Sequence, residues 1–219
     1  MKLSATVGDL FHKLPKVDIF DCIVLGAGSG GEIKKISQKF EKNNIDAIEV
    51  GNFWRERLNS ISNITYLQRI ITSSKQDFLT YYESSHGPQA GSLVKSVNSI
   101  SEHKVKTIRL NEIIDEYFTD KIDLLSMDIE GEEINILRDN IDKVSKKVKS
   151  IHIHTHSRKI EADLIQLLQK NDYELIFLFP FPKKPIFYKD GIQFWYNKNY
   201  WHKGITERTS WDPESEQYN

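Results

Sequence analysis

The segment VLGAGSGGE, residues 24–32, links a short apolar stretch to a helical pattern through a glycine-rich run. Gly26, Gly28 and Gly31 match G-x-G-x-x-G, a pattern typical of dinucleotide-binding loops. Gly26, Gly28 and Gly30 equally match the looser G-x-G-x-G of S-adenosylmethionine-binding loops. Both loops turn tightly after a buried strand and let a ligand approach the backbone, which requires glycine. The segment therefore predicts a strand–turn–helix unit of an α/β fold and leaves hydride transfer and methyl transfer open.

Short apolar runs and helical periodicity alternate on both sides of this loop. Strands are expected at 21–25, 45–50, 63–72, 105–110, 122–131, 148–156, 173–179 and 191–197. Because the first three are joined by connections of crossover length, they are expected to lie parallel. The last two are joined by the proline-bearing segment 180–190, which excludes a helix. This ending predicts an antiparallel pair at one edge of the sheet.

The chain is expected to form a single domain over residues 1–205. Residues 1–20 are expected to be a helical lead-in, and residues 206–219 a polar tail. The irregular stretch 75–104 is interpreted as a lid or an insertion, because a loop of that length beside a sheet is usually functional. Within it, QDFLTYYES (76–84) suits an extra strand, and SSHGPQAGS (84–92) is expected to be a loop.

The composition narrows the class of partner. Thirty Lys and Arg residues balance 31 Asp and Glu residues, for a net charge of -1, and no clustered basic excess suggests a nucleic-acid partner. The single cysteine, Cys22, excludes an intrachain disulfide and is expected to be a buried strand residue. No stretch approaches the ~20 apolar residues of a membrane helix. We expect a cytoplasmic protein without membrane insertion, with homo-oligomerisation possible.

Two acidic residues bear on the cofactor. Glu49 ends the second expected strand, about 20 residues after the loop, where an acid can accept both ribose hydroxyls of either cofactor. Glu32 follows the last glycine, and a carboxylate there would compete with the pyrophosphate that NAD places on a helix N-terminus. Glu32 and the short chain favour S-adenosylmethionine. An NAD-dependent oxidoreductase and a non-catalytic binding module of the same fold remain as alternatives.

The stretch 107–137 resembles FkbM-type methyltransferases, whose signature contains I-D-x-L-K-x-D-x-E-G-x-E. The matching residues are Asp123, Asp128, Glu130, Gly131, Glu133 and Leu137. The resemblance spans roughly Asp21 to His156. It implies a Rossmann-like class I fold, with a seven-stranded, mostly parallel sheet in the order 3-2-1-4-5-7-6 and an antiparallel edge strand. It also implies S-adenosylmethionine as donor and O-methylation of a small molecule or glycan, with a sugar hydroxyl of surface polysaccharide or natural-product biosynthesis expected.

The resemblance assigns cofactor contacts along the loop and the strand ends. They are Gly26, Ala27, Gly28, Ser29, Gly30, Glu49 and Asp128. The chain departs from the family pattern at several positions, where the usual acid, proline, lysine, aspartate and glutamate are replaced by Val24, Val50, Ser126, Asn111 and His154. Val24 stands where the family has an acid two residues before the first glycine. These departures indicate an outlying member and keep the non-catalytic alternative open.

The catalytic candidates are Asp128, His156 and Glu130. Asp128 and His156 are expected to border the transferred methyl group, with His156 as a base near neutral pH. Glu133 is expected to contact substrate or to cap a helix start.

His154, a further substrate candidate, alternates with His152 and His156 along one strand face. With Asp128, these histidines suit a divalent metal. The favoured interpretation is that His152 packs under a helix and only the last one or two histidines reach the active edge.

Overall fold

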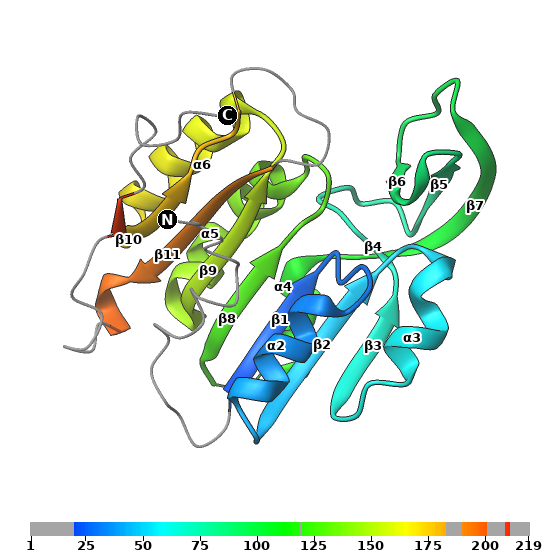
Figure 1. Ribbon diagram of the computed structural model, residues 1–219. Coiled ribbons are helices and arrows are strands. Elements are labelled where there is room, and N and C mark those ends of the chain that lie inside the picture. The colour runs from blue at the N-terminus through cyan, green and yellow to red at the C-terminus, as the bar shows by residue number, and fades with distance from the viewer. Residues whose placement is uncertain (1–19, 119, 183–189, 201–208, 211–219) are drawn as a thin grey trace, which may run out of the picture.

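The computed structural model describes residues 20–118, 120–182, 190–200 and 209–210. Its main sheet has eight strands in the order β12-β10-β11-β9-β8-β1-β2-β3 (Figure 1). These strands are β1 (Phe20–Leu25), β2 (Asn43–Glu49), β3 (Ile64–Gln68), β8 (Ile122–Met127), β9 (Val148–Thr155), β10 (Tyr173–Phe179), β11 (Gly191–Asn197) and β12 (Thr209–Ser210). Nearly all of the expected lead-in and tail lies outside the described residues.

The order β3-β2-β1-β8-β9-β11-β10 is the expected 3-2-1-4-5-7-6 order. β1 is parallel to both β2 and β8, as crossover connections require. β11 runs antiparallel to β9 on one side and to β10 on the other, so the predicted antiparallel pair is confirmed. The two-residue strand β12 adds an eighth member, parallel to β10.

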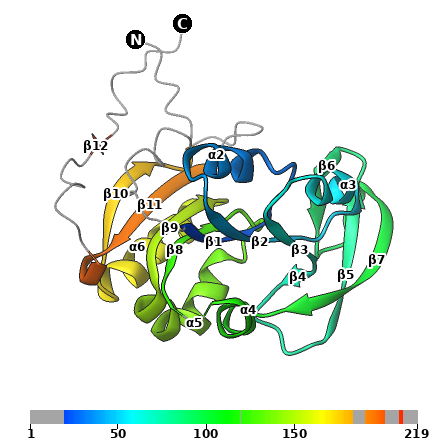
Figure 2. The same cartoon turned by 90° about the horizontal axis from the view of Figure 1, so that it is seen from below.

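Helices cover both faces of this sheet and give it two hydrophobic cores (Figure 2). On one face lie α2 (Gly31–Lys39) and the short α3 (Arg55–Asn59), and on the other lie α4 (Leu110–Tyr117), α5 (Glu133–Lys147) and α6 (Arg158–Lys170). Apolar residues recur at helical spacing, so each helix buries one stripe against the sheet. Ile33 and Ile36 of α2 are fully buried, as are Leu164 and Leu168 of α6.

A second, four-stranded sheet stands beside the carboxyl edge of the first, in the order β4-β7-β5-β6. It comprises β4 (Ile70–Ile71), β5 (Phe78–Ser84), β6 (Gly87–Ser92) and β7 (Ser99–Ile108). The extra strand predicted over 76–84 is present as β5. The loop predicted over 84–92 is wrong beyond the turn at 85–86, because β6 pairs antiparallel with β5. Backbone pairing overrides the Gly- and Pro-rich composition there.

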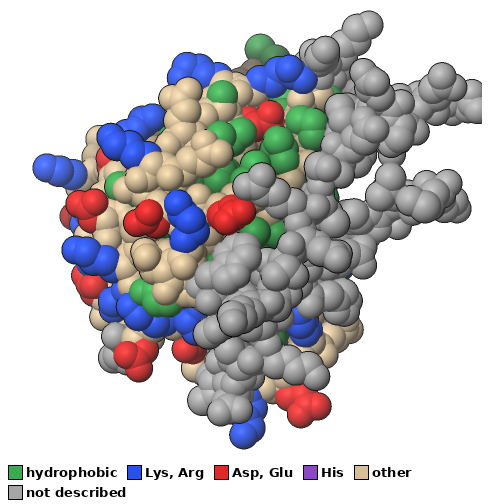
Figure 3. All heavy atoms as spheres, turned by 90° about the vertical axis from the view of Figure 1, so that its left-hand side faces the viewer, with side chains coloured by type: hydrophobic (Ala, Val, Ile, Leu, Met, Phe, Trp, Pro, Cys, Tyr) green, Lys and Arg blue, Asp and Glu red, His purple; other side chains and the backbone are tan. Residues whose placement is uncertain are grey.

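The surface carries both signs of charge. On the face shown in Figure 3, Lys and Arg side chains are interspersed with Asp and Glu over the described part. None of the helices in the described part of the chain is long and apolar enough to cross a membrane. Cys22 is fully buried in β1, as predicted.

Asp46 is a buried acid in β2, and its removal should stabilise the fold. Burial raises the pKa of its carboxyl to about 6, against 3.8 for an ordinary aspartate, although a hydrogen bond with Thr65 opposes this. Since the folded-state pKa is the higher one, this carboxyl costs stability as the pH rises from about 4 through 6. Asp46→Asn should therefore add about 1–3 kcal/mol to the free energy of unfolding at pH 8 and much less at pH 4.

Urea unfolding at the two pH values measures this difference. Asp120→Asn, an exposed control, should change neither value. An equal gain from Asp46→Asn at both pH values would show that burial does not raise the pKa of Asp46.

Candidate active site

The glycine turn after β1 is held against the start of the β8–α5 connection. Gly26 has a φ of 77°, in the left-handed region. A Cβ at Gly26 would overlap the carbonyl oxygen of Asp128, so only glycine fits. The N–H groups of Gly26 and Ala27 donate to the carbonyl of Ile48 at 2.9 and 3.0 Å. The turn thereby brings the ends of β1, β2 and β8 together.

Gly28 and Glu49 meet at the next point of this turn. The Gly28 N–H donates to Oε2 of Glu49 at 2.8 Å, and the Gly51 N–H donates to Oε1 at 2.7 Å. A Cβ built at Gly28 meets nothing within 4 Å, so the space beside this residue is open. Burial raises the pKa of Glu49, and the hydrogen bonds from Gly51 and Gly28 oppose that rise. Glu49 is thus a buried carboxylate beside the open space at Gly28.

A cavity of about 250 Å³ lies at this edge of the main sheet. Its lining includes Gly26, Gly28, Glu49, Asp128 and Glu130 of the sheet edge. The β5–β6–β7 side closes it with Tyr81, Gly91, Ser92, Leu93 and Val94.

The other predicted cofactor contacts, Ala27, Ser29 and Gly30, lie outside this lining. Gly30 is the N-cap of α2, and its missing Cβ leaves room for Ile61 and Leu58. In this structure Gly30 therefore serves helix packing instead of lining the cavity.

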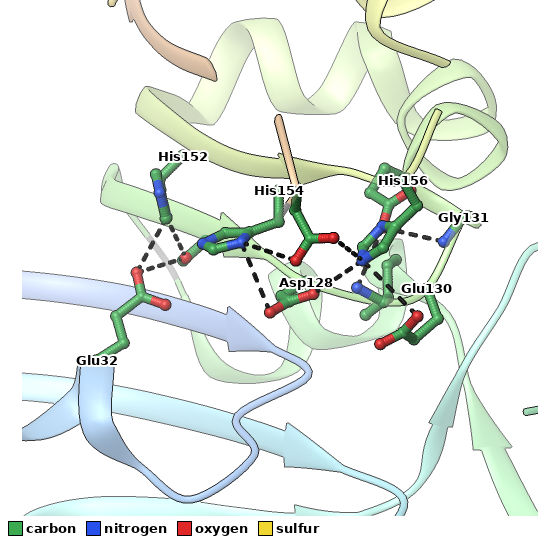
Figure 4. A network of polar contacts seen from close by, with 11 residues as sticks. Glu32, Asp128, Glu130, Gly131, His152, His154 and His156 are labelled. Carbon is green, nitrogen blue, oxygen red and sulfur yellow. Dashed lines mark hydrogen bonds and ion pairs between the residues drawn. The ribbon is translucent and has the colours of Figure 1, made fainter. Parts of the chain in front are cut away.

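Beside the cavity, two histidines of the β9 end face Asp128 at the end of β8 (Figure 4). His156 Nε2 lies 3.3 Å from Oδ1 of Asp128, and His154 Nδ1 lies 3.8 Å from Oδ2. Glu130, with Oε2 3.8 Å from His156 Nε2, follows Asp128 in a left-handed conformation (φ 57°). Such a φ is rare for a non-glycine residue and turns the chain sharply before α5.

Asp190 completes this group and was not predicted. Its Oδ1 lies 3.9 Å from His156 Nε2, and its Oδ2 lies 3.7 Å from His154 Nδ1. Asp190 directly precedes β11, whose first residue, Gly191, pairs with Thr155 of β9. The sequence signal was the Asp–Gly pair before the last long strand, but the pairing register that brings it to His156 is not visible there.

Glu133 was predicted to contact substrate or to cap a helix start, and the structure excludes the first role. Its side chain is fully buried, so no substrate reaches it. Oε1 accepts hydrogen bonds from the N–H groups of Ile129 and Gly131 at 3.1 and 3.2 Å. The same oxygen lies 2.9 Å from His156 Nδ1. Glu133 therefore orders the β8–α5 turn and orients His156.

The electrostatics of this group alter the predicted role of His156. Burial lowers the pKa of this imidazole, but Asp128 and Glu133 outweigh it and raise the pKa to about 11. The imidazole of His156 is therefore protonated near neutral pH, and this arrangement does not favour His156 as the proton-accepting base.

The two acids that flank His156 shift in opposite directions. Burial raises the pKa of Asp128, but the histidines outweigh it and lower the pKa. Burial raises the pKa of Glu130. Glu130 is thus the acid with the stronger tendency to take up a proton.

His152 lies apart from the active edge, under α2. Its Nδ1 is 3.1 Å from Oε1 of Glu32 and 2.9 Å from the hydroxyl of Ser126, which donates to Glu32 at 2.6 Å. Burial opposes ionisation of Glu32, but His152 and Ser126 lower its pKa. Glu32 is thus an ionised, largely buried carboxylate in the first turn of α2. Its partner Ser126 lies in β8 and pairs with Val24 of the neighbouring strand β1. Figure 4 shows the side chain of Glu32 pointing to His152.

A family model for the FkbM methyltransferase domain matches residues 26–175, which cover both the glycine turn and the histidine-rich strand. The chain belongs to the FkbM methyltransferase domain family. The predicted family and the class I methyltransferase fold are thereby confirmed.

The individual matches have either a low sequence identity or a short aligned length. A sequence named "Putative methyltransferase" from Jannaschia sp. (strain CCS1) is 43% identical over 54 residues, 25% of this chain and 19% of that protein. The FkbM methyltransferase structure from Methylobacillus flagellatus KT aligns with a TM-score of 0.53 at 16% identity, covering 85% of this chain and 50% of that one. Precorrin-6y C5,15-methyltransferase from Geobacter metallireducens GS-15 gives 0.52 at 16% identity, covering 87% of each. The chain covers half or less of the length of the Jannaschia protein and of the Methylobacillus flagellatus protein.

Proposed function

We propose that this chain transfers a methyl group from S-adenosylmethionine to a hydroxyl group of a small molecule or glycan. The expected acceptor is a sugar hydroxyl in surface-polysaccharide or natural-product biosynthesis. The observation that carries the proposal is the cavity of about 250 Å³ between the glycine turn, Glu49 and the acidic end of β8. Open α/β sheets bind ligands at this edge.

The residues around the turn fit this donor. Gly28 leaves open space for close approach of a ligand, and the carboxylate of Glu49 retains acceptor capacity beyond its backbone hydrogen bonds. Glu32 adds an ionised carboxylate in the first turn of α2, where a pyrophosphate would otherwise be favoured. A cofactor with a cationic sulfonium and no phosphate suits this charge better than NAD.

The transfer needs a proton acceptor for the hydroxyl. When bound, the donor provides a methyl group on a positively charged sulfur. We assign the proton acceptor as Glu130, which lines the cavity and has a raised pKa. Glu130 takes the hydroxyl proton while the oxygen–carbon bond forms, the carbon–sulfur bond breaks and its electron pair remains on sulfur. His156 and Asp128 position Glu130 and the acceptor.

Glu49→Gln should weaken binding of S-adenosylhomocysteine by at least about tenfold. The amide NH₂ would face one of the two N–H donors that now bind the carboxylate, and a ribose hydroxyl would lose a charged acceptor. Isothermal titration calorimetry measures the affinity. Glu56→Gln, an exposed control on α3, should keep the wild-type value.

The same titration with NAD⁺ separates the two cofactor classes. We expect heat from S-adenosylhomocysteine and none from NAD⁺; NAD⁺ binding without S-adenosylhomocysteine binding would overturn the proposal. Transfer of a labelled methyl group to a panel of glycans and hydroxylated small molecules tests the acceptor class. Donor binding without transfer to any acceptor would favour the non-catalytic alternative raised by Val24.

A further inference from the structure

The geometry points to a binding site for one divalent transition-metal cation, formed by Asp128, His154, His156 and Asp190. This inference does not require the methyl-transfer proposal, because it concerns the cation alone. The four side chains come from three neighbouring strand ends: Asp128 follows β8, His154 and His156 belong to the β9 end, and Asp190 precedes β11.

These four residues form a closed ring in which histidine and aspartate alternate. His154 Nδ1 lies 3.8 and 3.7 Å from the Oδ2 atoms of Asp128 and Asp190. His156 Nε2 lies 3.3 and 3.9 Å from the Oδ1 atoms of the same two residues. Two ligands of a tetrahedral cation bound at about 2.1 Å lie about 3.4 Å apart. The ligand atoms of Asp128, His154 and Asp190 lie within 4.8 Å of one another, close to this spacing, and His156 faces the same two aspartates. Figure 4 shows His154 and His156 on the same side of Asp128.

The Nδ1 atom of His154 is a buried polar atom that lacks a partner. This nitrogen is shielded from solvent and has no hydrogen-bond partner. The two nearest carboxylate oxygens are too far away for hydrogen bonds. A buried polar atom without a partner is costly, and a cation between this nitrogen and the two carboxylates would satisfy all three groups.

His156 shows the arrangement that supports a metal ligand from behind. Its Nε2 faces the two aspartates, while its Nδ1 lies 2.9 Å from Oε1 of Glu133, a fully buried carboxylate, without the geometry of a hydrogen bond. Metal-binding histidines almost always direct the second ring nitrogen to a carboxylate or carbonyl, which fixes the ring. Two backbone N–H groups hold Glu133, which fixes this carboxylate beside the ring.

Charge and access also suit a cation. Asp128, Asp190 and the adjacent Glu130 are three carboxylates within 4 Å of His156. The side chains of Asp128 and Asp190 are 40% and 37% exposed, which leaves an entry path. Two imidazoles with two carboxylates favour Mn²⁺, Fe²⁺ or Zn²⁺ over Mg²⁺, which prefers oxygen ligands. Asp128 also lines the cavity, so the cation would lie at its rim, where it could acidify a bound hydroxyl.

The test is titration of the full chain with MnCl₂, after dialysis against EDTA and without methyl donor. Loss of the free Mn²⁺ signal in electron paramagnetic resonance should report one bound ion per chain, and MgCl₂ should compete at least about tenfold more weakly. Asp190→Asn and His154→Gln should each weaken Mn²⁺ binding by at least about tenfold. His103→Gln, a half-exposed histidine of β7 outside the ring, should bind as the wild type does.

Thermal unfolding shows whether each variant is folded and whether Mn²⁺ stabilises it. Mn²⁺ should raise the unfolding temperature of the wild type and of His103→Gln but not of Asp190→Asn or His154→Gln. No Mn²⁺ binding, binding unchanged in both ring variants, or Mg²⁺ affinity equal to that of Mn²⁺ would each overturn the site. Because no methyl donor is present, such a result would leave the proposed methyl transfer standing.

Discussion

Gly26→Ala should lower the free energy of unfolding by about 3 kcal/mol or more. The left-handed φ of 77° alone costs a non-glycine residue about 1–2 kcal/mol. The added Cβ would also overlap the carbonyl oxygen of Asp128, which cannot move freely because the Asp128 N–H donates to Leu25 at 2.9 Å. For a chain of this length, the unfolding temperature should fall by about 6–12 °C. Urea and thermal unfolding measure both quantities.

Gly28→Ala is the matched control for this contact. Gly28 also has a positive φ, of 48°, but its added Cβ meets nothing within 4 Å. Its destabilisation should stay near the backbone cost of about 1–2 kcal/mol. Since the Cβ enters the open space in which the proposed donor would bind, the affinity for S-adenosylhomocysteine should fall about tenfold or more. Equal destabilisation by the two substitutions would contradict the close contact between Gly26 and Asp128.

Glu130→Gln should lower kcat for methyl transfer by about 10²–10⁴-fold, the usual contribution of a positioned general base. The donor affinity should change much less, because Glu49 and the glycine turn carry the proposed donor contacts. Burial raises the pKa of Glu130, and a base must be ionised. The wild-type rate should therefore fall as the pH drops through that raised pKa, and the variant should lack this limb.

Steady-state kinetics over a range of pH, with an acceptor found in the panel, give this comparison. Glu102→Gln serves as the control, because this side chain is largely exposed on β7 and pairs with Lys95. Its kcat should stay near the wild-type value. If Glu130→Gln retained the wild-type rate and pH profile, Glu130 would not be the proton acceptor, and Asp128 would be the next residue to test.

Much of the fold follows from local patterns. Gly26, with its strand before and helix after, predicted the turn that the structure shows. The alternation of strands and helices, together with the proline-bearing link 180–190, predicted the parallel sheet and its antiparallel pair. These features depend on side-chain periodicity and turn chemistry within short windows, which a sequence displays directly. The β5–β6 pairing was missed, because a glycine- and proline-rich strand has no such periodicity.

The candidate site could be predicted only in part. Asp128, Glu130, His154 and His156 were predicted because they follow or end strands that a parallel sheet aligns at one edge, and the structure places their side chains close together. Asp190 was missed, since an antiparallel register after a long link depends on pairing between distant segments. The substrate role of Glu133 was wrong because its burial under the β8–α5 turn is a tertiary property.

By itself, the sequence determined the α/β class, the glycine turn and the acids that follow β8, because each depends on neighbours a few residues away. Only the tertiary structure decided that Asp190 faces two histidines, that Glu133 is buried behind His156 and that Glu32 is held by His152. These contacts join residues that are distant along the chain, up to the 120 positions between Glu32 and His152. Burial and charge at such junctions arise from packing, and packing fixes the chemistry that the side chains perform.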